Sequence, residues 1–357
     1  MDEIVRKKST NEKCANCGSN LVFDPETQAL KCASCQSTFG FEKSQNVKKH
    51  AWEMRTKVGD YDKWITEKKF VKCSSCGAQV MLDRLDLTQT CPYCGCDYVL
   101  EKEQIAGYQP DAVLPFMLDY EKIKEAYIKG VRKKFFAPRA FKKMPPVDKI
   151  RGIYVPLFIF DADSDTNYRG TLTKVTTKTN SKGKTVTERK SFNISGNKKM
   201  NHRDFIEESS SKINRNDLLN LLPYDLSQSF TFDEDFLRGY SVEHYDDDLE
   251  NAYTRSHQYM EKDIKNYILS GYDYTYVDSF NMKVDFFNEL YTYRLAPVYV
   301  FEFTFKKKFR RILVNGQNGK IATGVPVSGL KVAAVSILGI IILIALIILF
   351  ISIRKGE

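Results

Sequence analysis

Four cysteine pairs, each with two residues between its cysteines, constrain the fold of this chain most strongly. In both halves of the pattern 14 residues separate the first pair from the second, and the second half follows the first after 59 residues. A two-residue spacer lets both thiolates of a pair face one metal ion, and the segment between pairs is long enough for a hairpin. The spacing therefore predicts two zinc ribbons, each holding one structural Zn²⁺ ion. The eight predicted ligands are Cys14, Cys17, Cys32, Cys35, Cys73, Cys76, Cys91 and Cys94.

Three other uses of paired cysteines compete with a structural metal site. A thioredoxin-like redox centre has a single CxxC motif in a βαβ setting, without a second pair. Disulfides are rare in cytosolic proteins, and a catalytic zinc needs an open coordination position, which four thiolates close. The ninth cysteine, Cys96, stands where the first repeat has Ser37, so the repeat excludes it from the ligands. Structural zinc is the interpretation that fits the spacing.

A run of 22 residues without a charge, residues 332–353, lies between Lys331 and Arg354. At about 1.5 Å per residue a helix of this length reaches ~33 Å, enough to cross a hydrocarbon core of ~30 Å. We therefore predict a transmembrane helix, because a buried core helix is rarely so long or so rich in Ile and Leu. Basic residues flank the run almost equally and do not orient it. Residues 1–13 lack the apolar segment of a signal peptide, so we expect a single-pass protein of the cytoplasmic membrane with its globular part in the cytoplasm.

The remaining sequence predicts an α+β fold with a mainly antiparallel sheet and a few helices. The 20 Tyr and 23 Phe residues favour half-buried strands. Hydrophobic periodicity predicts helices over 120–133 and 247–269, and strands over 152–161, 297–305, 309–315 and 320–325. Residues 168–177 and 184–194 alternate around Asn180-Ser-Lys-Gly183, which predicts a hairpin.

These elements predict five successive parts. Zinc ribbon 1 occupies residues 1–45 and zinc ribbon 2 residues 70–108, with a helical connector over 46–69 between them. We expect both tryptophans of the connector, Trp52 and Trp64, to pack onto a ribbon. An α+β globular domain over 109–329 precedes the transmembrane helix over 332–353.

The distribution of charge bears on possible partners more than the total of +9 does. Residues 1–108 contain 16 Lys and Arg against 15 Asp and Glu, and two four-thiolate zinc sites make this segment net acidic. This charge argues against nucleic-acid binding by the ribbons. Residues 129–151 hold nine Lys and Arg against one acid, and residues 306–311 are also strongly basic. These stretches either contact anionic lipid head groups or are solvated edges that resist strand pairing.

The sequence contains no signature of a known enzyme class. It has no HExxH or GxSxG motif, and Lys178 replaces the first glycine of a phosphate-binding loop before Gly183-Lys-Thr185. The four histidines, at positions 50, 202, 244 and 257, lack ligand spacing. The acidic residues 246–248 are explained by the dipole at the start of the predicted helix. We expect no catalytic residues and no bound organic cofactor.

Several short motifs occur in an order that resembles one bacterial family. These are the two ribbons, Phe136-Ala-Pro, the segment 153–162, Leu222-Pro-Tyr-Asp225, the segment 314–320 and the terminal anchor. Together they resemble the YdjG-like family of membrane-anchored double zinc-ribbon (TFIIB-type) proteins, often labelled primosomal helicase-related. The resemblance implies SPFH-domain or PspA-like partners and a role in envelope stress.

Two functions from different classes follow as expectations. The first is a membrane-anchored adaptor that binds cytosolic or membrane-associated proteins and recruits them to the membrane in an envelope-stress response. The second is a membrane-tethered nucleic-acid binder that uses the basic central stretch, for which binding should depend steeply on salt.

Overall fold

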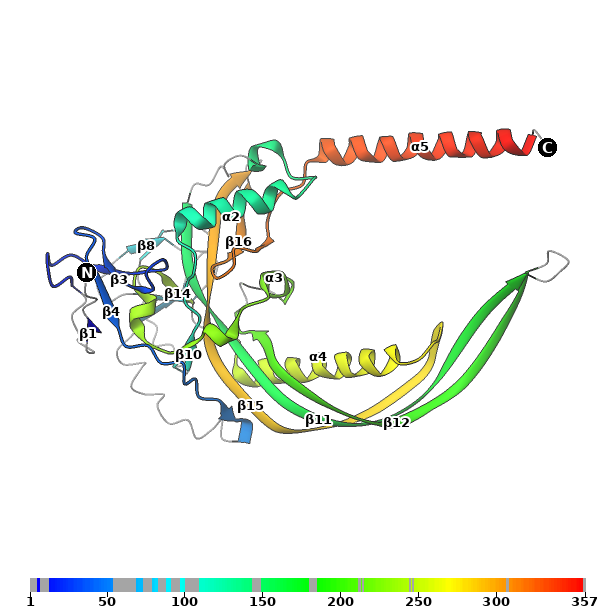
Figure 1. The fold of residues 1–357 in the computed structure, drawn as a ribbon, viewed down its shortest axis with the longest axis horizontal. Coiled ribbons are helices and arrows are strands. Elements are labelled where there is room, and N and C mark those ends of the chain that lie inside the picture. Colours follow the sequence, from blue (N-terminus) through cyan, green and yellow to red (C-terminus); the bar gives the residue numbers. More distant parts are fainter. Residues whose placement is uncertain are drawn as a thin grey trace.

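The computed structural model describes residues 5–6, 13–53, 69–72, 79–82, 88–90, 97–99, 109–142, 149–179, 185–210, 213, 215–243, 245, 247–305 and 308–355. Within them the fold is mixed α+β, with a large and mainly antiparallel sheet and one apolar helix at the C-terminal end (Figure 1). The α+β class expected from the sequence is confirmed at this level. The division into five domains stays a prediction.

Three long strands form the frame of the large sheet. β11 (Lys149–Thr179) pairs antiparallel with β12 (Thr185–Glu208) on one side and with β15 (Tyr276–Phe305) on the other. β15 continues the antiparallel order into β16 (Lys308–Asn315), and β16 pairs with β17 (Ile321–Thr323). Figure 1 shows the three long strands curving together, with the far ends of β11 and β12 reaching beyond β15.

Short strands complete the sheet near its base. β10 (Ala112–Val113) runs parallel to β15 and antiparallel to β13 (Phe230–Thr231), while β14 (Ser241–Glu243) runs parallel to β11. β5 (His50–Ala51) pairs with β15, and β7 (Gln79–Leu82) lies between β14 and β6 (Lys69–Lys72). Parallel and antiparallel pairs thus coexist, and segments far apart in the sequence meet in one sheet of 11 described strands.

Both faces of the sheet are buried at its base, where successive residues of β15 alternate between two clusters. Leu295, Tyr299 and Phe301 face one cluster, while Ala296 and Val298 face the other. The first face is covered by α2 (Tyr120–Arg132), and the second by α3 (Arg215–Leu221). This alternation follows from the period of two of a strand.

The two helices predicted over 120–133 and 247–269 are confirmed. The Asp119 side chain caps α2 by accepting from the Lys122 N–H at 2.7 Å, and the Asp248 side chain caps α4 (Leu249–Ser270) by accepting from the Asn251 N–H at 2.7 Å. The acidic start of α4 thus serves as a helix cap. Figure 1 shows α4 along the inside of the curved strands.

The strands are longer than the sequence predicts. The predicted strands over 152–161 and 168–177 are both parts of β11, and shifts in register beside Ala162 mark where the polar segment between them bends. The Asp161 carboxylate accepts from the Asp204 N–H at 2.8 Å, and Asp163 accepts from Asn201 at 3.0 Å and Asn288 at 2.9 Å. Polar residues continue the strand here because neighbours on both sides satisfy them. The predicted hairpin and the strands near 297–325 are confirmed.

Trp52 packs on the main domain. Its ring stacks on Tyr253 of α4, with centroids 3.6 Å apart and planes 7° apart, and lies 6.0 Å from Tyr291. The residue therefore joins the start of the predicted connector to α4 and β15, and its expected packing onto a ribbon stays a prediction. Trp64 and most of the connector lie outside the described residues.

Candidate metal centre

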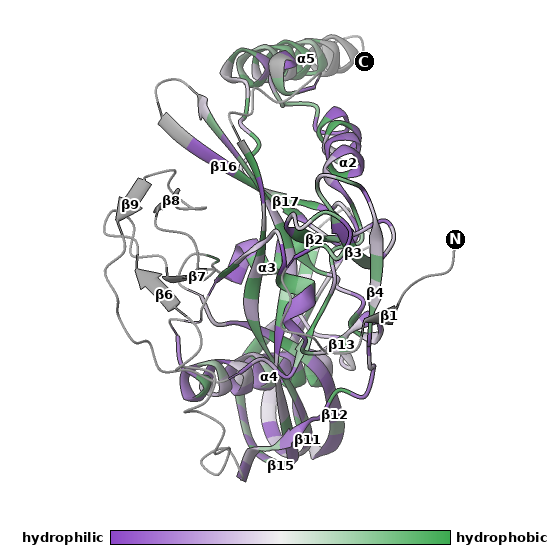
Figure 2. Cartoon of the chain, turned by 90° about the vertical axis from the view of Figure 1, so that its left-hand side faces the viewer, coloured by the Kyte–Doolittle hydropathy of each residue, from purple (hydrophilic) through white to green (hydrophobic). Residues whose placement is uncertain are grey.

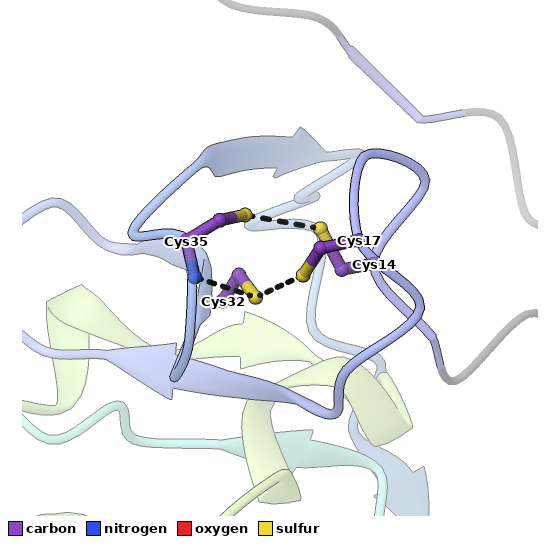
Figure 3. Close-up of side chains that lie close together, drawn as sticks. All are labelled: Cys14, Cys17, Cys32 and Cys35. Carbon is purple, nitrogen blue, oxygen red and sulfur yellow. Dashed lines mark hydrogen bonds between the residues drawn. The ribbon is translucent and has the colours of Figure 1, made fainter.

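Four cysteines from two turns converge at the N-terminal end of the chain (Figure 3). The Sγ atoms of Cys14 and Cys35 lie 3.6 Å apart, and those of Cys17 and Cys32 lie 3.4 Å apart. All four Sγ atoms lie within 4.8 Å of one another. In a tetrahedral site with Zn–S bonds of about 2.3 Å, neighbouring sulfurs are about 3.8 Å apart. The cluster therefore has the spacing of a four-thiolate metal site, and four such ligands leave no open position for a substrate.

The backbone of the two turns explains why the thiolates converge. Gly18 and Gln36 follow the second cysteine of each pair, and both have a positive φ, of 76° and 62°. Their N–H groups donate to the carbonyls of Cys14 and Cys32, at 2.8 and 3.1 Å. In each turn, a residue in the left-handed conformation lets the chain reverse direction around two sulfurs. Glycine adopts this conformation without strain.

Backbone and side-chain donors also stabilise the thiolates. The Asn16 N–H points at the Cys14 Sγ at 3.4 Å, and the Cys35 N–H points at the Cys32 Sγ at 3.4 Å. The Ser37 hydroxyl lies 3.2 Å from the Cys35 Sγ, and hydrogen bonding by Ser37 lowers the pKa of the Cys35 thiol to about 6. Ser37, the counterpart of Cys96 in the repeat, thus lies beside the ligands. A thiolate present at neutral pH is the form that binds metal.

The ribbon around this cluster is a small sheet attached to the main domain. β2 (Leu21–Asp24), β3 (Ala29–Cys32) and β4 (Thr38–Phe41) pair antiparallel, and β1 (Val5–Arg6) pairs parallel with β4. Phe23 and Phe41 pack on Phe236 with ring centroids 5.3 and 4.9 Å apart. Phe236 lies in the 3₁₀ helix η4 (Glu234–Leu237) of the main domain.

The two ends of the ribbon differ in their exposure. The hairpin end joins the main hydrophobic cluster, and the Phe23 N–H donates to the Arg238 carbonyl at 2.9 Å. At the other end Cys14 and Cys32 are buried, while Cys17 and Cys35 are exposed. Figure 3 shows the cysteine turns on the side of the ribbon away from the main domain. A partner could therefore reach the turns without disturbing the core.

The second cysteine repeat is described only through its strands, since Cys73, Cys76, Cys91 and Cys94 lie outside the described residues. The strands nevertheless repeat the register of the first ribbon 59 residues later. The Lys13–Asn20 bridge corresponds to Lys72–Gln79 in β6 and β7. Likewise the pairing of β3 with β4 corresponds to that of β8 (Thr88–Thr90) with β9 (Asp97–Val99). One difference is that β7 pairs with β14, so that this repeat extends the large sheet.

The described histidines do not form a second metal cluster with the cysteines. His50 pairs with Asp111 at 2.5 Å, His202 lies 3.1 Å from the Ser164 hydroxyl, and His257 pairs with Glu289 at 2.6 Å. The space beside His257 leaves no room for a water molecule. Each of these three histidines thus has a partner within the fold. His244 lies outside the described residues.

The motifs near residues 222–225 and 314–320 meet in one corner of the domain. The Asn315 side-chain amide donates to the Leu221 carbonyl at 2.9 Å, and that of Asn318 donates to the Pro223 carbonyl at 2.8 Å. The Asp225 N–H donates to the Gln317 side chain at 2.7 Å. A shallow hollow of about 320 Å³ lies between the two motifs. The side chains of the second motif thus support the backbone of the first.

The C-terminal helix α5 (Gly329–Lys355) is the one described helix that is long and apolar enough to cross a membrane. No part of its most apolar stretch is buried within the molecule. Figure 2 shows hydrophobic residues along the helix, which stands apart from the sheet. A helix with an apolar surface on all sides is stable in hydrocarbon and unfavourable in water.

Comparison with known proteins adds one relative. The chain is 27% identical over 333 residues to the uncharacterized protein YdjG of Bacillus subtilis (strain 168), which covers 90% of this chain and 92% of that protein. The similarity supports a YdjG-like family. By itself it does not establish a zinc ribbon or a membrane anchor. No protein-family model and no solved structure matches the chain.

Proposed function

We propose that this protein is a membrane-anchored adaptor, not an enzyme, in which metal-stabilised ribbons recruit partner proteins to a membrane. The observation that carries the proposal is the attachment of the first ribbon. Its hairpin end is fixed to the main domain through Phe23, Phe41 and Phe236, while its cysteine turns face solvent. A rigid protruding surface on a chain with an unburied apolar helix suits recruitment.

The metal in this proposal is zinc, at two sites. Cys14, Cys17, Cys32 and Cys35 would bind the first ion, and the register shared by β6 to β9 with the first ribbon supports a second site formed by Cys73, Cys76, Cys91 and Cys94. A closed four-thiolate ion supplies folding energy rather than chemistry. Each ribbon is too short a segment to fold unaided, so the ion would supply part of its stability.

The cellular setting of the proposal comes from the family resemblance. We place the globular part in the cytoplasm and the single helix in the cytoplasmic membrane, with SPFH-domain or PspA-like proteins as partners in an envelope-stress response. The competing function, tethered nucleic-acid binding, rests on the basic stretches alone.

Anchoring by α5 places a condition on the orientation of the molecule. Figure 1 shows α5 and the far end of the β11–β12 hairpin extending toward the same side. The first seven residues of β12 are all exposed, and they include Glu188, Arg189 and Lys190. Such a strand cannot enter hydrocarbon. In a bilayer α5 and the hairpin must therefore point in different directions.

An affinity pull-down from cells with intact membranes tests the proposal. We would compare the full chain, a chain ending at Ser328, and a Cys14→Ser, Cys17→Ser double variant. Cys96→Ser is the matched control, because it removes a cysteine that the repeat excludes from the ligands. We expect a discrete set of proteins with the full chain and the control, and loss of that set from the double variant.

Each outcome of the pull-down separates the two functions. If the double variant and the full chain capture the same proteins, the ribbon is not the recruiting surface and the adaptor proposal is wrong. If nuclease treatment removes the captured proteins and moderate salt releases bound nucleic acid from the chain, the function is nucleic-acid binding and not recruitment.

A further inference from the structure

The segment between α2 and the 3₁₀ helix η2 (Arg139–Lys142) is tied to the beginning of α5. The Ser328 N–H donates to the Phe136 carbonyl at 2.8 Å. The Lys331 ammonium donates to the carbonyls of Phe135 and Ala137, at 3.0 and 2.7 Å. These bonds hold residues 135–137 level with the first turn of α5. A surface that contacts the start of α5 would therefore also contact residues 135–137 (Figure 1).

Two phenylalanines of the segment point away from the core. Phe135 is 63% exposed and Phe136 is 39% exposed, with ring centroids 5.2 Å apart. Their neighbours Ala137 and Phe141 are buried, and Phe141 packs on Phe303 at 5.1 Å. Ala137 and Phe141 thus fix the segment to the domain, while Phe135 and Phe136 are exposed to solvent. Exposed adjacent aromatic rings on a fixed backbone are costly in water and typical of a contact surface.

The charge around the two rings has one sign. Residues 129–142 include six Lys and Arg and no Asp or Glu. Residues 132–136, with the sequence Arg-Lys-Lys-Phe-Phe, are all exposed. Arg132 and Lys142 also brace the segment, since each side chain donates to the main-chain carbonyl of the other at 3.4 Å. Aromatic rings among fixed cations match the boundary between anionic head groups and acyl chains.

We propose that residues 132–142 form a second membrane contact, in which Phe135 and Phe136 insert below the head groups and the surrounding cations bind anionic lipid. This inference rests on α5 spanning the bilayer, as in the proposed function. Continuity with α5 favours a bilayer over a protein or nucleic acid as the occupant, because the bonds to Ser328 and Lys331 bring the segment to the membrane surface. The contact would limit the freedom of the domain above the membrane and fix the direction in which the ribbons face.

Fluorescence quenching in nanodiscs tests the contact with the full chain. Phe135→Trp is compared with Phe287→Trp, which replaces a phenylalanine of similar exposure, 45%, on the long part of β15. Discs contain either neutral phosphatidylcholine or a mixture with phosphatidylglycerol, each with lipids brominated near the top of the acyl chain. Wild-type emission in the same discs gives the background from Trp52 and Trp64.

We expect bromine to quench the added emission of Phe135→Trp in the mixed discs and to leave that of Phe287→Trp unchanged. A Lys133→Ser, Lys134→Ser background should lower the equilibrium constant for insertion, obtained from the quenched fraction, by roughly fivefold for each cation removed, in mixed discs only. Equal quenching in neutral and mixed discs would contradict the role of the cations. Emission of Phe135→Trp that stays unquenched in chains retained by the discs overturns the contact. Chains that leave the discs show instead that α5 does not anchor, which is a failure of the proposed function.

Discussion

Replacement of Phe236 by alanine should separate the first ribbon from the main domain. Phe236 is 0% exposed and its ring lies 5.3 Å from Phe23, 4.9 Å from Phe41 and 5.5 Å from Phe230. A buried Phe→Ala change costs about 3–5 kcal/mol. Each aromatic pair adds about 0.5–1.5 kcal/mol beyond its buried area. Because the Phe236 ring packs on all three of these neighbours, we expect a decrease near the upper end, about 4–5 kcal/mol, in the free energy of unfolding.

Two measurements on the purified chain in detergent check this expectation. Urea unfolding gives the free energy, and hydrogen exchange of residues 21–41 reports whether the ribbon loosens. Exchange in β2 to β4 should accelerate while the metal content stays the same, because the cysteine turns lie at the opposite end of the ribbon. Phe287→Ala is the exposed control and should change the free energy by about 0.5 kcal/mol or less. A loss below about 1 kcal/mol for Phe236→Ala, or unchanged exchange, would refute a rigid attachment.

Three further predictions concern other parts of the chain. Burial lowers the pKa of His202 below its usual 6.5. As the pH drops below 6.5, His202 is therefore protonated in the unfolded state before it is protonated in the folded state, and thermal stability should fall. His202→Asn should flatten this decline. Gly18→Ala should cost about 1 kcal/mol of ribbon stability because of its φ of 76°, whereas Gln36→Gly at φ 62° should cost none, as measured by resistance to a chelator. Asn315→Ala should cost about 2–3 kcal/mol in urea unfolding, because the buried amide bonds the Leu221 carbonyl and two N–H groups.

Each of these predictions has an outcome that would contradict it. A wild-type chain and a His202→Asn variant with the same dependence on pH would show that another group controls acid sensitivity. Equal effects at Gly18 and Gln36 would mean that the left-handed turns do not limit metal retention. An Asn315→Ala variant as stable as Asn318→Ala, which loses an exposed hydrogen bond, would show that the corner formed by the two motifs adds little stability.

Local patterns predicted much of the fold. Regularly spaced apolar residues predicted both helices, and α2 and α4 begin within two residues of the predicted starts. The regular cysteine spacing predicted the convergence of Cys14, Cys17, Cys32 and Cys35, because the geometry of such a turn is set within a few residues. Features that are determined over short distances in the sequence could therefore be predicted from it.

Contacts between distant segments could not be predicted in the same way. Residues 162–167 are too polar to suggest a strand, and they continue β11 only because β12 and β15 pair with them on both sides. The packing of Phe23 on Phe236 and of Trp52 on Tyr253 joins residues roughly 200 positions apart. Nothing in either local sequence specifies such a partner. The same holds for residues 135–137, whose position beside α5 depends on bonds to Ser328 and Lys331.

The most direct test of recruitment is the location of the captured proteins in the cell. Their membrane-bound fraction would be measured after cell fractionation in strains that express the full chain, the chain ending at Ser328 or the Cys14→Ser, Cys17→Ser variant. The adaptor account predicts a high fraction with the full chain and a shift to the cytosolic fraction with both altered chains. Captured proteins that remain at the membrane in all three strains would contradict it.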